Sequence, residues 1–518
     1  MGHPLLLPED PWAELSAVEA EVAAASAALA ALVHKMHALK ARVNNIYSPF
    51  VRLLPPEVVS EVFTYFNPSF SAGDDDIHSS CAGHNPLLLG AVCSSWREIA
   101  WSTPSLWATL TLHITSPNRI PAQIQLIEQW LGRSGSLPLS IKLSACTSMS
   151  WLGTTPEGII HAINQFSSRW ANLDIRFPSQ CYKYLPRTGT PGVHLPFLQS
   201  VSLKPPGGQS DREHRICMQD APRLRHLNLS CLYLRSITFN WESVTSMDLE
   251  SFYIDESLGM LLGAPALVDL TLRRTLGGDD RHTLPFDCVH LPSLQSITII
   301  NDKGTEMQTL LNKIVAPQLR KIVYAGEGVL PAPSTELLAL IVRSNCTIEE
   351  LTLTRASIRE EALLALFSVM PSLVALTLVM PPGHSVRHTP LTDRILTMCN
   401  PDYTNANGLA CQLPLLQKIV YSGPQGFRWE VLRTLLDARL QPFARSGGRL
   451  CISSPGEYET SVSCISDIQL SIAFSSRVDA LKQLPHTPDA AAIKSYRSGG
   501  VNLSFYSTIP EEDLDPFS

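Results

Sequence analysis

The side chains best able to do chemistry at close spacing are six potential metal ligands in one segment. They are Asp74, Asp75, Asp76, His78, Cys81 and His84. Zinc accepts carboxylate, imidazole and thiolate ligands. Their spacing matches no familiar zinc site, and serine and glycine surround them. We therefore interpret the segment as a solvated polar loop and predict no metal ion and no cofactor.

Catalytic motifs are absent from the sequence. It contains no Gly-x-Ser-x-Gly turn, no Walker phosphate loop, no His-Glu-x-x-His and no Cys-x-x-Cys. Gly326-Glu-Gly328 lacks the third glycine of a dinucleotide-binding loop. His34 and His37 lie three residues apart, at positions that we expect to face solvent on a helix. The sequence therefore predicts no catalytic residues and a protein that is not an enzyme.

Composition excludes several partner classes. The 518 residues are 45% apolar and 17% charged, which is typical of a globular protein, and the net charge of −7 gives no basic footprint for nucleic acid. The longest nearly apolar stretch, 22–33, is far shorter than the roughly 20 residues of a membrane helix. Residues 1–10 lack the basic start of a secretion signal. Twelve dispersed cysteines indicate reduced thiols, so we expect no membrane association and a cytoplasmic or nuclear location.

A long helix should open the chain. From residue 11 to residue 46, apolar side chains recur at alternating steps of three and four, which is a heptad pattern. The charges are segregated, with Glu14, Glu19 and Glu21 near the start and Lys35, Lys40 and Arg42 near the end. A parallel partner would bring Lys35 near Lys40, so this pattern favours an antiparallel one. The helix is expected either to pack on its own chain or to self-associate through residues 11–46.

A helical block follows at 53–107. Leu54-Pro55-Pro56 begins a helix that continues through Phe63 at helical spacing. After a polar insert at 67–85, Asn85 should cap a second helix with a broad apolar face that reaches Ala100. A short turn then carries Leu106 and Trp107.

Strand–helix units make up most of the remaining chain. We expect strands at 109–114, 137–143 and 172–177, and helices at 121–132, 156–168, 334–343 and 357–369. The phrase Pro-x-Leu-x-x-apolar-x-apolar recurs with prolines at 196, 222, 265, 292, 317, 371 and 414. Units of about 20–29 residues with this phrase are typical of leucine-rich repeats. The asparagine usual after the strand is replaced by Leu232, Thr275, Asp302 or Pro381, so the repeats should be irregular.

The helical block resembles an F-box. More narrowly, the chain is similar to the large fungal F-box-like families, which place a heptad helix before the box and irregular leucine-rich repeats after it. The resemblance implies a receptor subunit whose box binds a Skp-family adaptor and, through it, a cullin scaffold. By motif position, the residues implied to contact the adaptor are Leu54, Pro55, Pro56, Val58, Val59, Val62, Phe63, Pro86, Leu87, Leu88, Val92, Cys93, Trp96 and Arg97. The insert is longer than usual, and paired valines replace larger residues.

The expected fold class is α/β, with an N-terminal heptad helix and a helical F-box followed by an irregular leucine-rich-repeat solenoid. The expected domains are 1–47 (heptad helix), 48–108 (F-box-like), 109–445 (repeats) and 446–518 (C-terminal cap and acidic tail). The implied function is that of a substrate receptor of an SCF-type ubiquitin ligase, with an unknown protein substrate on the repeats. The alternative is a non-ligase interaction scaffold with a degenerate box. Candidate substrate contacts, by phase in the repeats, are Arg225, His226, Asn228, Arg320 and Tyr324.

Overall fold

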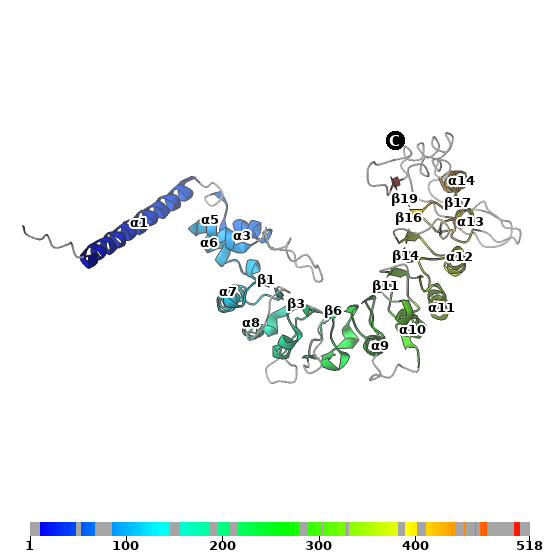
Figure 1. Cartoon of the computed structure of the whole chain (residues 1–518), viewed down its shortest axis with the longest axis horizontal. Helices are drawn as coiled ribbons and strands as arrows, with labels where there is room; N and C mark the ends of the chain where they lie inside the picture. The colour runs from blue at the N-terminus through cyan, green and yellow to red at the C-terminus, as the bar shows by residue number, and fades with distance from the viewer. Residues whose placement is uncertain are drawn as a thin grey trace, which may run out of the picture. The chain divides into compact units, whose positions relative to one another are not determined.

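In the computed structural model the chain forms two compact units (Figure 1). Unit 1 comprises residues 1–113 and 118–142, and unit 2 comprises residues 114–117 and 143–518. The structure describes the chain except residues 1–10, 48–52, 68–84, 146–155, 187–193, 207–215, 279–286, 302–303, 327–330, 382–388, 401–410, 441–449, 452–460, 463–466, 474–501 and 508–518. The proposed cap at Asp10 and the insert between Asn67 and Asn85 lie outside the described residues.

Unit 1 is mainly helical. Its elements are α1 (Pro11–Tyr47), α3 (Pro56–Thr64), α5 (Pro86–Val92), α6 (Ser94–Trp101), the 3-10 turn η1 (Pro104–Trp107), β1 (Thr109–Ile114) and α7 (Ile120–Arg133), and β2 (Leu139–Ala145) crosses into unit 2. The predicted long first helix is confirmed. A proline in the first turn begins α3 and α5, as the sequence indicated.

The second predicted helix, 86–100, is interrupted, so the expectation of one continuous helix is wrong. Asn85 does cap its start, since its side-chain oxygen accepts a hydrogen bond from the Leu87 amide at 3.0 Å. Cys93, however, has extended backbone angles and ends α5. Its Sγ then accepts from the Trp96 amide and caps α6. A cysteine is an uncommon helix cap, and the apolar pattern alone gave no sign of this break.

The core of unit 1 is built around Trp107. This residue is fully buried, and its Nε1 donates to the carbonyl oxygen of Ala100 at 2.8 Å. Its ring meets those of Trp101 and Trp130 edge to face, with centroids 5.4 and 4.9 Å away. The Arg133 guanidinium lies 5.1 Å from the rings of Trp101 and Trp107. Such aromatic clusters stabilise a core beyond the area that they bury.

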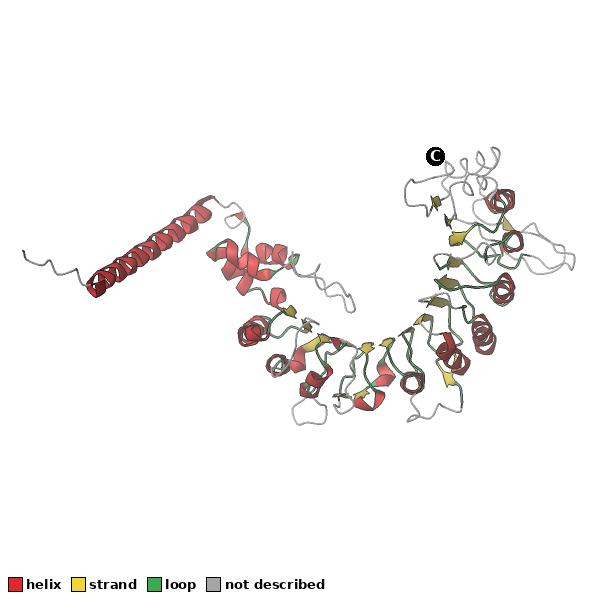
Figure 2. Cartoon of the chain, in the orientation of Figure 1, coloured by secondary structure: helices red, strands yellow, loops and turns green. Residues whose placement is uncertain are grey.

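Unit 2 contains a large parallel sheet with helices on one side of it (Figure 2). The strands of this sheet follow one another in chain order, and each pairs with the strand of the sheet that comes next along the chain. The strands are β3 (Trp170–Arg176), β4 (Ser200–Leu203), β6 (His226–Ser230), β8 (Ser246–Glu250), β9 (Asp269–Arg273), β11 (Ser296–Asn301), β13 (Lys321–Gly326), β14 (Glu350–Thr354), β15 (Ala375–Val379), β16 (Lys418–Pro424), β19 (Asp467–Ala473) and β20 (Asn502–Ser507). The chain is thus a mixed α/β protein with a long N-terminal helix and a large parallel sheet.

The helices of unit 2 are short and pack in chain order. They are α8 (Glu157–Asn164), α9 (Ile254–Leu262), α10 (Gly304–Lys313), α11 (Ser334–Ser344), α12 (Glu360–Ser368), α13 (Asp393–Met398) and α14 (Trp429–Leu440). Three small two-stranded sheets lie beside the main one: β5 (Ile216–Met218) with β7 (Ile237–Phe239), β10 (Val289–His290) with β12 (Ile314–Val315), and β17 (Leu450–Cys451) with β18 (Ser461–Val462).

The recurring proline phrase forms a turn followed by a buried rung. In each phrase the amide of the first leucine donates to the carbonyl three residues earlier, as Leu319 does to Ala316 at 3.2 Å. The intervening proline suits the second position of such a turn. The two later apolar residues are buried and in register: Ile322 lies opposite Leu351, and Leu351 lies opposite Leu376. The phrase therefore fixes both the turn and the register of the strand.

A left-handed residue directly follows several strands, one position before that of the missing asparagine. Cys231, Ser251, Arg274 and Arg355 have φ between 46° and 58°. Each donates its amide to a carbonyl of the next strand, as Arg355 does to Val379 at 2.7 Å. The turn after the strand is thus closed by the backbone itself, at some conformational cost for residues other than glycine.

The sheet continues past residue 445, where the sequence showed no repeat phrase. β19 pairs with β16, and β20 pairs with β19, both in parallel. The acidic residues 511–513 of the predicted tail lie outside the described residues.

Burial raises the pKa of the thiols of Cys181 and Cys399 to about 12, so both are protonated core residues at neutral pH. Free thiols in the described ranges include those of Cys93, Cys181, Cys217, Cys231, Cys288, Cys346, Cys399 and Cys411.

Candidate functional site

No group of three or more potential metal ligands lies within the described parts of the chain. The six candidate ligands at 74–84 fall outside those parts. The remaining candidates are surfaces that could bind another protein, and the first of these contains the residues implied by the F-box resemblance.

Helix α3 divides its candidate residues between core and surface. Val59 and Phe63 are buried, with 1% and 3% of their area exposed. Val58 and Val62 are 43% and 44% exposed, and four residues apart they share one face of the helix. Pro55 and Pro56 are exposed, and Leu54 is half-buried.

Helices α5 and α6 also carry candidate residues both in the core and on the surface. Pro86 is buried. Leu88 and Val92 are 52% and 53% exposed on one face of α5. Arg97 is exposed, and Leu87, Cys93 and Trp96 are half-buried. Of the fourteen implied residues, Val59, Phe63 and Pro86 therefore belong mainly to the core, and the exposed apolar ones form two short rows.

The helices that carry these rows are held closely together. The rings of Phe63 and Trp96 lie 4.9 Å apart and join α3 to α6. Arg97 Nε donates to the Gly90 carbonyl oxygen at 2.7 Å and joins α6 to α5. A Cβ on Gly90 would lie 1.9 Å from the Trp101 ring, so only glycine permits this approach. The two rows are thus displayed on a fixed helical frame.

Two exposed apolar residues near these rows escaped the sequence reasoning. Tyr65 is 81% exposed, and Leu53 is 78% exposed. Tyr65 follows Val62 by three residues, and this helical spacing could have placed it on the same face. Exposed apolar side chains gathered on one frame are typical of a protein-binding surface.

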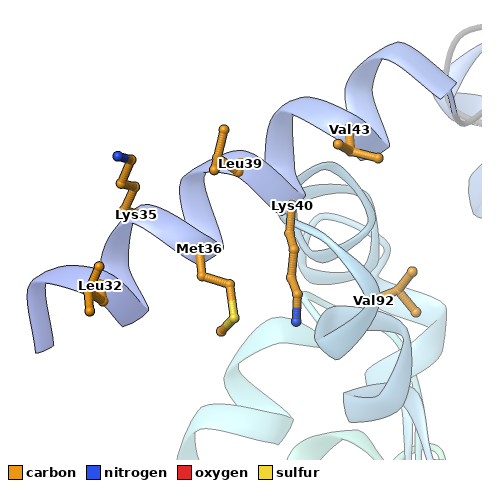
Figure 3. Close-up of a pocket in the computed structure, with 7 residues that line it drawn as sticks. All are labelled: Leu32, Lys35, Met36, Leu39, Lys40, Val43 and Val92. Carbon is orange, nitrogen blue, oxygen red and sulfur yellow. The ribbon is translucent and has the colours of Figure 1, made fainter. Parts of the chain in front are cut away.

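Unit 1 also contains a shallow hollow of about 620 Å³ (Figure 3). Six of its lining residues belong to the second half of α1: Leu32, Lys35, Met36, Leu39, Lys40 and Val43. The seventh is Val92 of α5. Its lining combines an apolar floor with two lysines, which suits an apolar segment that carries acidic side chains.

The exposed face of the sheet in unit 2 is lined by charged pairs between adjacent strands. Lys321 Nζ lies 2.7 Å from Glu350 Oε2, and Lys418 Nζ lies 2.9 Å from Asp467 Oδ2. Further pairs are Arg273 with Asp248, Arg274 with Glu250 and Arg320 with Glu349. Exposed pairs contribute little to stability, about 0 to 1 kcal/mol each, so a ligand could replace them at small cost.

The candidate substrate contacts on the strand–helix segments differ in their exposure to solvent. Arg225, His226 and Arg320 are exposed, and Asn228 is half-buried, as a contact surface requires. The expectation for Tyr324 is wrong, because it is only 1% exposed. Along a strand, alternate residues point to opposite faces, so Tyr324 faces the core with Ile322. Burial raises the pKa of its phenol.

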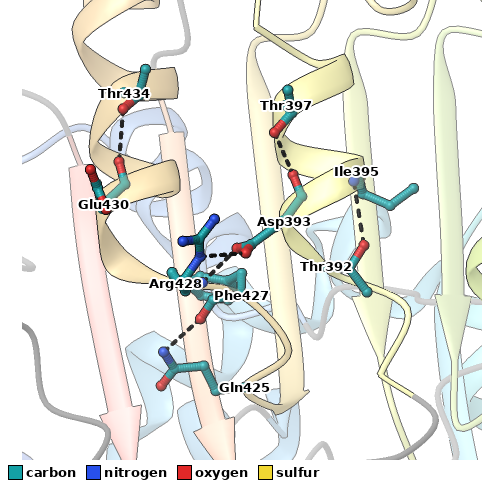
Figure 4. Close-up of polar contacts among 9 residues, drawn as sticks. All are labelled: Thr392, Asp393, Ile395, Thr397, Gln425, Phe427, Arg428, Glu430 and Thr434. Carbon is teal, nitrogen blue, oxygen red and sulfur yellow. Dashed lines mark hydrogen bonds and ion pairs between the residues drawn. The ribbon is translucent and has the colours of Figure 1, made fainter.

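A polar joint fixes the start of α13 against the start of α14 (Figure 4). The Arg428 amide and Nε each donate to a carboxylate oxygen of Asp393 at 2.7 Å. This hydrogen bond and charge raise the pKa of the Arg428 guanidinium. Thr392 caps α13 by accepting from the Ile395 amide at 3.4 Å. Each of these groups has a hydrogen-bond partner within the two helix starts, which indicates a structural role.

One helix of the described chain, Trp12–Val43 in α1, is long and apolar enough to cross a membrane by length and composition alone. The nearly apolar stretch at 22–33, on which the expectation of no membrane association rests, is only the central part of this helix. An N-terminal signal sequence passes the same test, so this finding is weak evidence for a membrane span.

Comparison with known proteins identifies no family. No protein-family model matches the chain, and no curated protein matches it. Among the solved structures that match is a crystal structure of a Bacteroides fragilis protein from a structural genomics consortium, 12% identical, with a TM-score of 0.28. The match covers 52% of this chain and 66% of that one. A likeness this slight carries no argument about function.

Proposed function

We propose that the chain is a substrate receptor of an SCF-type ubiquitin ligase. In this proposal α3, α5 and α6 form an F-box that binds a Skp-family adaptor, and the adaptor joins the chain to a cullin scaffold. The observation that carries the proposal is the exposure of Val58, Val62, Leu88 and Val92, which are apolar residues at implied contact positions. An apolar surface on a fixed frame loses little entropy when it binds.

The strand–helix units of unit 2 would then act as an irregular leucine-rich-repeat solenoid that holds the substrate. The repeating phrase, the parallel pairing in chain order and the exposed charged face support this assignment. The chain itself would make and break no bond. Holding substrate and ligase together raises the effective concentration of the substrate near the ubiquitin-carrying enzyme.

Titration of the full chain with a purified Skp-family adaptor tests the proposal. Val62→Asp and Leu88→Asp each place a charge in the proposed contact, and we expect each to weaken binding at least about tenfold. Val342→Asp is the matched control: Val342 is an exposed valine, 62% accessible, on α11 of unit 2, and its substitution should leave binding unchanged.

Two results would contradict the ligase assignment. One is a folded full chain that does not bind the adaptor at micromolar concentration. The other is binding that both aspartate variants retain. The first would favour the alternative function, an interaction scaffold whose F-box-like block serves only the fold. The second would place the adaptor contact on another surface and so remove the observation that carries the proposal.

A further inference from the structure

The apolar seam of α1 lies on the surface of the structure. Leu15, Val18, Val22, Leu29, Leu32, Met36, Leu39, Val43 and Ile46 are between 42% and 64% exposed. They occupy the first and fourth positions of five successive heptads, with Ala25 at the remaining position. Such a seam along about 50 Å of helix is typical of coiled-coil contacts.

The charges beside this seam reverse sign at the middle of the helix. Glu14, Glu19 and Glu21 flank its first half, and Lys35, Lys40 and Arg42 flank its second half. In a parallel pair, residues five apart face each other across the seam, so Glu14 would meet Glu19 and Lys35 would meet Lys40. An antiparallel pair instead places the acidic half of each helix beside the basic half of the other.

We propose that α1 binds α1 of a second copy in an antiparallel coiled coil. This inference does not depend on the proposed ligase function. When the two helices cross between Ala30 and Ala31, every seam residue faces a seam residue of the second copy. The layers are Leu15 with Ile46, Val18 with Val43, Val22 with Leu39, Ala25 with Met36, and Leu29 with Leu32, each formed twice.

The same register pairs the flanking charges. Glu19 comes beside Lys40 of the second copy, and Glu21 beside Arg42, again twice each. The first half of the second helix, with its acidic residues, would lie along the hollow that Leu39, Val43 and Lys40 line (Figure 3). Its apolar floor and its lysines match that segment in chemistry.

The charges also argue against a membrane as the occupant. Between Glu21 and Lys35 only residues 22–34 are uncharged, and a helix of that length spans about 20 Å. The hydrocarbon core of a bilayer is about 30 Å thick, so a spanning α1 would bring charges into it. A second copy buries the seam and leaves those charges at its edges.

Zero-length carbodiimide coupling of the full chain tests both the contact and its direction. Within one straight helix, Glu19 and Lys40 are about 30 Å apart and cannot be coupled. A coupled Glu19–Lys40 pair, found between ¹⁴N- and ¹⁵N-labelled copies, is therefore expected only from the antiparallel dimer. The uncoupled chain should have twice the mass of 56.9 kDa in solution.

Charge variants make the test sharper. Glu19→Lys/Glu21→Lys places cations opposite cations, and Lys40→Glu/Arg42→Glu places anions opposite anions. Each should raise the dimer dissociation constant at least about tenfold, and an equimolar mixture should recover a one-to-one dimer. The recovery also shows that each variant is folded.

The proposal is overturned by a wild-type chain that is monomeric at micromolar concentration, or by a dimer without the Glu19–Lys40 coupling. It is also overturned if the two charge variants fail to recover a dimer when mixed. A chain that is monomeric in buffer but sediments with phosphatidylcholine vesicles would assign the seam to lipid instead.

Discussion

At the residue scale, Gly326 shows how closely successive strand–helix segments of unit 2 approach each other. A Cβ at this position would lie 2.7 Å from the carbonyl oxygen of Arg355, which belongs to the next strand–helix segment. Arg355 is itself left-handed, with φ of 51°, so this backbone has little freedom to move away. The glycine therefore permits the close spacing of two strand–helix segments. This packing role explains the glycine at 326 without a nucleotide-binding loop.

Gly326→Ala should lower the free energy of unfolding by about 1 to 3 kcal/mol, because the new methyl group overlaps a backbone atom. Gly132→Ala is the matched control. Gly132 lies within α7, and nothing lies within 4 Å of its added Cβ. In that helix alanine should be neutral or should stabilise by up to about 1 kcal/mol. Urea unfolding of both variants measures the difference, and an equal effect on both would contradict the close approach.

At the element scale, a buried arginine fastens α14 to the turn before β16. Arg439 is 1% exposed, and its guanidinium donates to the carbonyl oxygens of Cys399, Leu413 and Pro414 at 2.6, 2.7 and 3.1 Å. On α11, Arg343 donates in the same manner to the carbonyls of Leu311 and Ile314, both at 2.6 Å. An arginine near the end of a helix thus satisfies carbonyls of the segment beneath it.

Arg439→Met keeps most of the buried apolar volume but removes these donors. The carbonyls left without them should lower the free energy of unfolding by about 3 kcal/mol or more. Arg394→Met is the control, since Arg394 is exposed and lies 3.5 Å from Glu360, and its loss should cost under about 0.5 kcal/mol. Similar denaturation midpoints for the two variants would show that the buried hydrogen bonds are dispensable.

Sequence periodicity predicted the regular elements well and their interruptions poorly. The heptad of α1 and the proline phrase were sufficient for the long helix and for the strands β4, β6, β9, β11, β13, β15 and β16, because burial sets both periods. The break at Cys93 depends on one side-chain cap, and β19 and β20 carry no complete phrase. Neither feature leaves a periodic trace.

The candidate surfaces were predictable to a similar degree. Motif position named Val58, Val62, Leu88 and Val92, which are exposed, together with Val59 and Phe63, which are not. Which side of a helix faces the core depends on the helices packed against it, and one sequence does not contain that information. For Tyr324 the sequence did hold the information, because a residue two positions from the buried Ile322 on a strand shares its buried face.

At the scale of the whole molecule, unit 2 is held together by contacts between neighbours. Its strands pair only with the next strands in the described sheet, and its helices pack in the same order. Stability in such an arrangement is close to a sum of local terms. A destabilising substitution at one end of the sheet should therefore affect only the neighbouring strands.

Leu470→Ala in β19 removes a buried side chain at one end, at a cost of about 2 to 5 kcal/mol. Amide hydrogen exchange should accelerate in β16, β19 and β20 and stay unchanged from β3 to β9. Leu272→Ala in β9, where the side chain is equally buried, should instead affect β8, β9 and β11. Uniform acceleration through the unit in both variants would indicate a single cooperative fold.

The pairing of strands in chain order also bears on how this protein can change over generations. A duplicated strand–helix segment would present the same two edges as the one it copies, and it would insert between its neighbours without new kinds of contact. Gain or loss of a segment would shift every later side chain by one place along the exposed face. The surface can therefore be rewritten by recombination as readily as by point mutation, while the buried rungs that support it stay the same.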